Sequence, residues 1–164
     1  MPIAPPPIDE ALRGAERAEA LFELAVQGRV GLLRALRAIV VHHSATPRHT
    51  AFVSLERAHA REGWPACGYH AVVLESGELV HSRPLPIAGA HAAGRNMDTI
   101  GLCIVGDNRF EDTRWSPAQI ATAREYIDAL DLLVPHLALI GHRDVKATLC
   151  PGMSTAELRV LLER

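Results

Sequence analysis

The sequence has few cysteines, no long hydrophobic run and no excess of charge of one sign. Its 164 residues include 17 Lys and Arg against 19 Asp and Glu, which gives a formal net charge of -2. Because no basic block is available to neutralise phosphates, we expect no nucleic-acid partner. No stretch approaches the roughly 18 consecutive apolar residues of a transmembrane helix, so we expect no insertion into a membrane.

Cysteine is too scarce and too scattered for a disulfide framework. The three residues Cys67, Cys103 and Cys150 are far apart in the chain, and their number is odd. A reducing compartment or a metal explains such a set better than disulfides do. The first residues also lack the basic and uncharged apolar regions of a secretory signal, so we expect synthesis in the cytoplasm without a signal peptide.

The length of the chain suits one compact domain with a sizeable core. Residues 1–7 are rich in proline and predict a loose tail. Residues 8–27 predict an amphipathic helix that ends at Gly28. We therefore divide the chain into an N-terminal tail and helix of unknown role, residues 1–35, and a main domain, residues 36–164.

Strands and helices are predicted in turn through the main domain. Apolar, β-branched runs predict strands in 37–46, 69–82, 99–106 and 136–142, the second run being two strands joined by a turn. Helical spacing and capping signals predict helices in 54–63, 116–134 and 154–164. Since the two kinds of element do not alternate strictly, we expect an α/β (α+β) fold with a mixed central β-sheet flanked by helices.

Two histidines and a cysteine stand where a metal site could form. His42 follows the apolar run "AIVV", His142 follows "LALIG", and Cys150 comes eight residues later in a loop. If the two strands are neighbours, their ends converge, and two imidazoles with one thiolate make a zinc site with one position open. The alternative is that the histidines pack or cap and that Cys150 is a small buried apolar residue. His43 lies beside His42, and strand alternation lets only one of the pair face the site.

Other polar residues could complete a site around that metal. Tyr69 begins a strand, where its phenol could donate to an oxyanion, although a half-buried strand aromatic is the commoner case. Thr148 could aim its hydroxyl at the same point. His91, Arg95 and Asn96 lie in a glycine-lined loop that could form a substrate wall, although loop polarity alone also explains them.

Six segments of the chain, taken together and in order, resemble the zinc-dependent N-acetylmuramoyl-L-alanine amidases of the phage-lysozyme type. The peptidoglycan recognition proteins of animals share that fold. The segments are "VVHHSAT", "GWPACGYHAVV", "AGAHAAGRN", "TIGLCIVG", "WSPAQ" and "GHRDVKATLCPG", which span roughly residues 38–163. Residues 1–35 lie outside the resemblance.

The resemblance implies roles for individual residues. It places the zinc ligands, for one Zn²⁺ per chain, on His42, His142 and Cys150 and the catalytic tyrosine on Tyr69. Active members usually have Lys or Thr two residues before the last ligand, which corresponds to Thr148. Binding of the glycan and stem peptide is expected from Trp64, His91, Arg95 and Asn96.

The implied activity is hydrolysis of the amide between N-acetylmuramic acid and the L-alanine of the stem peptide. The expected partner is peptidoglycan, and the chain is expected to be a bacteriolytic monomer that acts on the cell wall after release or export. A non-catalytic peptidoglycan-binding module is the alternative, although such modules usually lose the metal through the cysteine, which is retained here. A zinc-bearing domain with a protein partner and vestigial activity is a second alternative.

Overall fold

The computed structural model describes residues 33, 35–85 and 87–163 of the chain. The predicted tail and helix within residues 1–32 lie outside this part. Within the described residues, no helix is both long and apolar enough to cross a membrane.

Five strands form one mixed sheet in the described part of the chain. They are β1 (Ala38–His43), β2 (Ala71–Val73), β3 (Leu79–His81), β4 (Thr99–Ile104) and β5 (Ala138–Gly141). Their order across the sheet is β3-β2-β4-β1-β5. β3 pairs with β2 in antiparallel fashion, and β2, β4, β1 and β5 run parallel to one another. The predicted mixed sheet is confirmed.

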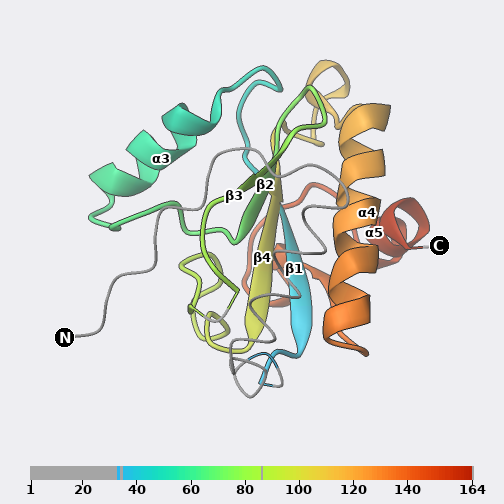
Figure 1. Ribbon diagram of the computed structural model, residues 1–164. Helices are drawn as coiled ribbons and strands as arrows, with labels where there is room; N and C mark the ends of the chain where they lie inside the picture. The colour runs from blue at the N-terminus through green and yellow to red at the C-terminus, as the bar shows by residue number, and fades with distance from the viewer. Residues whose placement is uncertain (1–32, 34, 86, 164) are drawn as a thin grey trace.

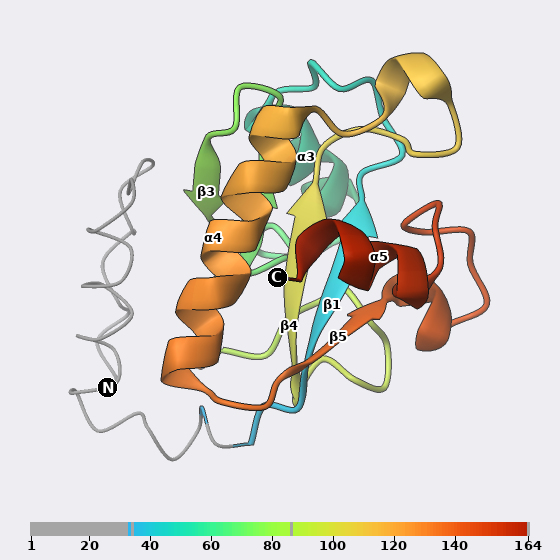
Figure 2. The same cartoon turned by 90° about the vertical axis from the view of Figure 1, so that its right-hand side faces the viewer.

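Helices cover both faces of this sheet, as Figures 1 and 2 show. Helix α3 (Phe52–Arg61) lies over one face, and α4 (Pro117–Leu133) and α5 (Thr155–Leu162) pack on the other. Two short 3₁₀ turns, η2 (Glu111–Thr113) and η3 (His142–Asp144), follow β4 and β5. All three predicted helices of the main domain are present, and α3 begins two residues before the predicted start.

The start of α4 shows how strongly local sequence fixes this helix. Ser116 Oγ accepts a hydrogen bond from the Gln119 N–H, and the Gln119 side chain accepts one from the Ser116 N–H. Pro117 at the first turn loses nothing, because its missing N–H would have no partner inside the helix. The buried side chains Ala123, Ile127 and Leu130 recur at helical spacing and face the sheet. Ser154 and Glu157 form the same reciprocal cap on α5.

Two apolar clusters hold the layers together. The larger lies between the sheet and the helices α4 and α5, and it includes Ile39, Val41 and Leu102. The smaller lies under α3 and includes Leu55, Val72 and Cys103. Because side chains alternate along a strand, the even-numbered residues of β1 point to the α3 face, so His42 belongs to that side of the sheet.

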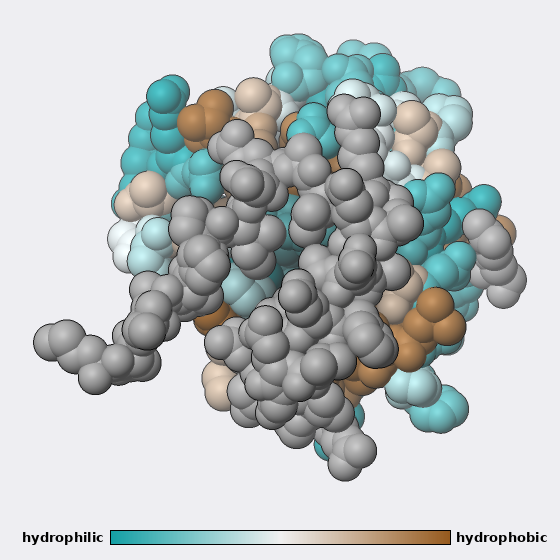
Figure 3. Space-filling model, in the orientation of Figure 1, coloured by the Kyte–Doolittle hydropathy of each residue, from teal (hydrophilic) through white to brown (hydrophobic). Residues whose placement is uncertain are grey.

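Exposed hydrophobic residues are scattered rather than gathered on α3. Only Leu55 of this helix is buried, and hydrophilic side chains gather over it at the upper left of Figure 3. Such a helix contributes a narrow apolar stripe to the core and presents a polar face to water.

The parallel arrangement brings the carboxyl ends of β1, β4 and β5 to one edge of the sheet. Val41 of β1 is paired with Gly141 of β5, so the next residues, His42 and His142, are neighbours. His142 was predicted to end a strand, whereas it begins η3 directly after β5. The predicted metal site required these two strands to be neighbours, and they are.

Candidate metal site and cleft

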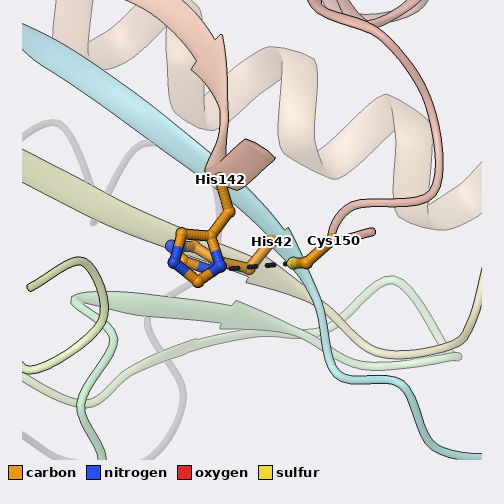
Figure 4. A group of neighbouring side chains, drawn as sticks. All are labelled: His42, His142 and Cys150. Atoms are coloured by element: carbon orange, nitrogen blue, oxygen red, sulfur yellow. Dashed lines mark hydrogen bonds between the residues drawn. The ribbon is translucent and has the colours of Figure 1, made fainter. Parts of the chain in front are cut away.

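The three predicted metal ligands meet at this edge of the sheet. The donor atoms of His42, His142 and Cys150 all lie within 4.8 Å of one another, and Figure 4 shows the side chains together. Sγ of Cys150 is 3.8 Å from Nδ1 of His42. Zinc–ligand bonds are about 2.0–2.3 Å long, so small side-chain movements would bring all three donors onto one ion. Two imidazoles and a thiolate suit zinc and leave a fourth, open position.

The loop after β5 folds back through its own hydrogen bonds. The Arg143 N–H donates to the Cys150 carbonyl at 2.9 Å, which closes the loop between the two ligands. The Cys150 N–H donates to Thr148 Oγ1 at 3.2 Å. These short-range hydrogen bonds place the Cys150 thiol at the same edge of the sheet as His142.

Of the two adjacent histidines, His42 belongs to the donor cluster and His43 does not. Its Nδ1 lies 3.4 Å from a carboxylate oxygen of Asp107 and accepts a hydrogen bond from the Asn108 N–H at 3.3 Å. Asp107 is held in turn by Arg109 through paired hydrogen bonds. His43 therefore supports the loop after β4, while His42 faces the other donors.

Burial keeps the two imidazole donors neutral. The pKa of His42 lies well below its usual value because of burial and then the neighbouring His91, His142 and His43. Burial lowers the pKa of His142, and Lys146 adds to the effect. Burial also raises the pKa of the Cys150 thiol to about 11. A metal that binds here must therefore displace the thiol proton, whereas the histidines offer free lone pairs.

The donors lie in a cavity of about 660 Å³. Of the predicted site residues, Trp64, Tyr69, His91, Asn96 and Thr148 line it together with the three donors. The volume is in the range of small-molecule binding sites, and the donor set is part of the cavity wall.

Tyr69 stands beside the cluster as predicted. Its ring centroid is 5.0 Å from that of His42. Burial raises the pKa of its phenol well above the usual value, and the thiols of Cys103, Cys150 and Cys67 add to that effect. The hydroxyl consequently keeps its proton and can donate it in a hydrogen bond.

Two residues of the predicted substrate wall have structural partners. Arg95 forms a two-pronged ion pair with Asp98, with Nε 2.9 Å from Oδ1 and Nη2 2.9 Å from Oδ2, and the cavity lining does not include it. Asn96 Oδ1 accepts from the N–H groups of His91 and Ala92 at 2.9 and 2.8 Å. Their roles in substrate binding stay predictions.

Three residues around the cavity were not found from the sequence. Arg109 and Lys146 line it and supply positive charge. His59, on α3, packs between Trp64 and Tyr69, with ring centroids 4.8 and 5.3 Å away. The position of Arg109 just after a strand end was a usable signal, whereas the contacts of His59 depend on how α3 docks.

A comparison with protein families identifies the family of this chain. A model of the N-acetylmuramoyl-L-alanine amidase family, Amidase_2, matches residues 33–153. The chain belongs to this family, and the predicted resemblance is confirmed.

Similar proteins include viral and animal enzymes. The endolysin of Enterobacteria phage T3 is 32% identical over 120 residues, which are 70% of this chain and 80% of the phage protein. The human N-acetylmuramoyl-L-alanine amidase is 32% identical over 147 residues, which are 80% of this chain and 25% of the human protein. Among solved structures, the endolysine N-acetylmuramoyl-L-alanine amidase LysCS from Clostridium intestinale URNW has a TM-score of 0.71 and 25% identity, over 79% of this chain and 84% of that chain.

Proposed function

We propose that this chain is a zinc-dependent N-acetylmuramoyl-L-alanine amidase that hydrolyses the amide between N-acetylmuramic acid and L-alanine in peptidoglycan. The observation that carries the proposal is the convergence of His42, His142 and Cys150 inside a cavity. When bound, zinc would polarise the scissile carbonyl and lower the pKa of a water molecule.

The surrounding residues supply the rest of the proposed chemistry. Tyr69 and Thr148 line the cavity beside the donors, and their hydroxyls would donate to the oxyanion that develops on the carbonyl. Each such donor is typically worth a few kcal/mol, since it acts on charge present only in the transition state. Trp64 forms an apolar wall, and the cations Arg109 and Lys146 suit the carboxylates of a stem peptide.

The bond that is cleaved can be identified from the products. Purified peptidoglycan is digested with the zinc-loaded protein, and the soluble products are analysed by mass spectrometry. We expect free stem peptides that begin with L-alanine, and we expect a chelator to stop their release and zinc to restore it. Binding to the wall without any release would favour the non-catalytic recognition module instead.

A bacteriolytic role is proposed from the phage endolysins among the relatives. The protein would act on the cell wall as a monomer. Loss of turbidity in permeabilised Gram-negative cells measures lysis, and light scattering measures the oligomeric state. A protein that releases stem peptides from purified wall but lyses no cells would point to wall remodelling.

A further inference from the structure

His91 touches the candidate ligand His42 on the side away from the other donors. Nδ1 of His91 and Nε2 of His42 are 3.1 Å apart, and both rings are buried. The rings meet edge to face, with an interplanar angle of 90°. His91 therefore makes its hydrogen-bond contact with the metal cluster through His42, on a nitrogen that the ion would not use.

The hydrogen bonds assign the protons on both rings. Nδ1 of His42 faces Sγ of Cys150 and so turns its lone pair toward the metal position. In a neutral imidazole the other nitrogen then carries the proton, so Nε2–H of His42 donates to His91. Nδ1 of His91 is the acceptor, and the His91 proton lies on Nε2.

The His91 ring lies in a slot that only glycine permits. A Cβ on Gly101 would lie 2.6 Å from Cδ2 and Cγ of this ring, and a Cβ on Gly89 would lie 2.3 Å from Cδ2. The wall at Gly101 is itself fixed, because the Gly101 N–H donates to Nδ1 of His70 at 2.9 Å. Two stretches of backbone thus clamp the ring and leave it little freedom to turn.

The rest of the His91 ring is also enclosed. Nε2 of His91 is buried and has no hydrogen bond of good geometry among the described residues, although the Thr99 backbone acts on the ring as a weak hydrogen-bond partner. The well-formed contact of the His91 ring is therefore the one that Nδ1 makes with His42.

We propose that His91 is a positioning residue that orients His42 for the metal by accepting its Nε2–H bond. The inference rests on the proposed zinc site. Metal-bound histidines generally donate their second N–H to a carboxylate, a carbonyl or water, which fixes the tautomer and the ring orientation. Here a second imidazole, clamped by the backbone at Gly89 and Gly101, would be that acceptor.

Three variants separate the acceptor atom from the shape of the ring. His91→Asn places Oδ1 near the present position of Nδ1, His91→Leu has the shape of Asn without the acceptor, and His91→Phe keeps a ring without one. Zinc affinity is measured by competition with a chelating dye, and the melting temperature of each metal-free variant reports folding. We expect Leu and Phe to weaken zinc binding by about 10–100-fold. The zinc affinity of His91→Asn should stay within a few-fold of that of the unmutated protein.

Cobalt substitution adds a readout that a purely structural role would not change. The visible bands of Co²⁺ and the thiolate-to-cobalt charge-transfer band report the geometry of the ligands. We expect them to shift in His91→Leu and His91→Phe and to persist in His91→Asn. The matched control is His81→Phe, which alters a histidine that packs on Tyr126 and does not line the cavity. It should leave the affinity and the bands unchanged.

Several results would overturn this proposal. Suppose that His91→Leu or His91→Phe folds and keeps the zinc affinity and the cobalt bands of the unmutated protein. The hydrogen-bond acceptor on His91 would then have no part in zinc binding. If His91→Asn lost as much zinc affinity as His91→Leu, the shape of the imidazole ring would matter rather than its acceptor atom. A raised KM with unchanged zinc affinity would return His91 to the substrate wall. If the unmutated protein took up no zinc, the proposed zinc site itself would be wrong, and this result is distinct from a failure of the His91 proposal.

Discussion

Nδ1 of His42 lies 3.8 Å from Sγ of Cys150, although the two residues are 108 positions apart in the chain. His42 is the last but one residue of β1, and Cys150 lies in the loop after β5; the parallel pairing of β1 with β5 brings them together. Both atoms are donors that a zinc ion prefers. The contact therefore links the topology of the sheet directly to the proposed chemistry.

Replacing Cys150 should remove zinc and activity together. In Cys150→Ala only two protein donors remain, so we expect loss of stoichiometric zinc and of stem-peptide release. Elemental analysis measures the zinc content, and mass spectrometry of the products measures the release of stem peptides. Cys67→Ala is the matched control, because Cys67 is buried under α3 and is not one of the clustered donors. Cys67→Ala should lose about 1–2 kcal/mol of stability and keep its zinc. If Cys150→Ala were fully active, Cys150 would not belong to the site.

Zinc uptake should release about one proton per chain near neutral pH. The pKa of Cys150 is raised to about 11, whereas the pKa values of His42 and His142 are lowered. The thiol is thus protonated and the imidazoles neutral before binding, so affinity should rise with pH. Calorimetry in buffers with different ionisation enthalpies counts the protons. Zinc binding with no pH dependence would contradict a thiolate ligand.

Removing the hydroxyl of Tyr69 should slow turnover without disturbing the metal. If Tyr69 donates only to the developing oxyanion, Tyr69→Phe should lower kcat by about 10²–10³ and change KM little. Zinc content and melting temperature should stay near those of the original chain. The other tyrosine provides the control: Tyr126 is buried, and among the described residues its hydroxyl has no hydrogen-bond partner. Tyr126→Phe should be fully active, and equal activity of Tyr69→Phe would exclude Tyr69 from the mechanism.

Asp107 should stabilise the fold except in strong acid. Its hydrogen bonds with Arg109 are the main cause that lowers its pKa from 3.8 to about 2. A lowered carboxyl pKa gives stability that is present above about pH 4 and is lost as the pH falls through about 2. Asp107→Asn should therefore cost about 1 kcal/mol at pH 7, the screened value of a partly exposed pair. Urea unfolding at several pH values tests this; a difference from the original chain that stays constant down to pH 2 would refute it.

The main domain should fold without the N-terminal segment. The family match begins at residue 33, and Leu33 is buried in the larger core cluster. We therefore propose that a chain lacking residues 1–30 keeps its fold and binds zinc. Circular dichroism, thermal melting and zinc titration compare it with the full chain. An insoluble or non-cooperative product would show that the segment belongs to the core.

The local sequence was sufficient to predict the helices and strands of the main domain. The reciprocal caps at Ser116 and Ser154 depend on residues three positions apart, so they are visible in the sequence and are confirmed. The eight-residue spacing from His142 to Cys150 was equally visible. Strand-end histidines and a nearby cysteine suit zinc, but their spacing left simple packing open, and the family resemblance favoured the metal.

Only the tertiary structure decided which side chains act together. From the strand pattern alone, His42 and His43 were equal candidates; the register of β1 between β4 and β5 turns His42 to the donors and His43 to Asp107. The close contact of His91 with His42 depends on the backbone at Gly89 and Gly101. Caps and periodicity depend on neighbours in the chain, whereas strand order and side-chain partners depend on burying both faces of the sheet, which involves residues far apart in sequence.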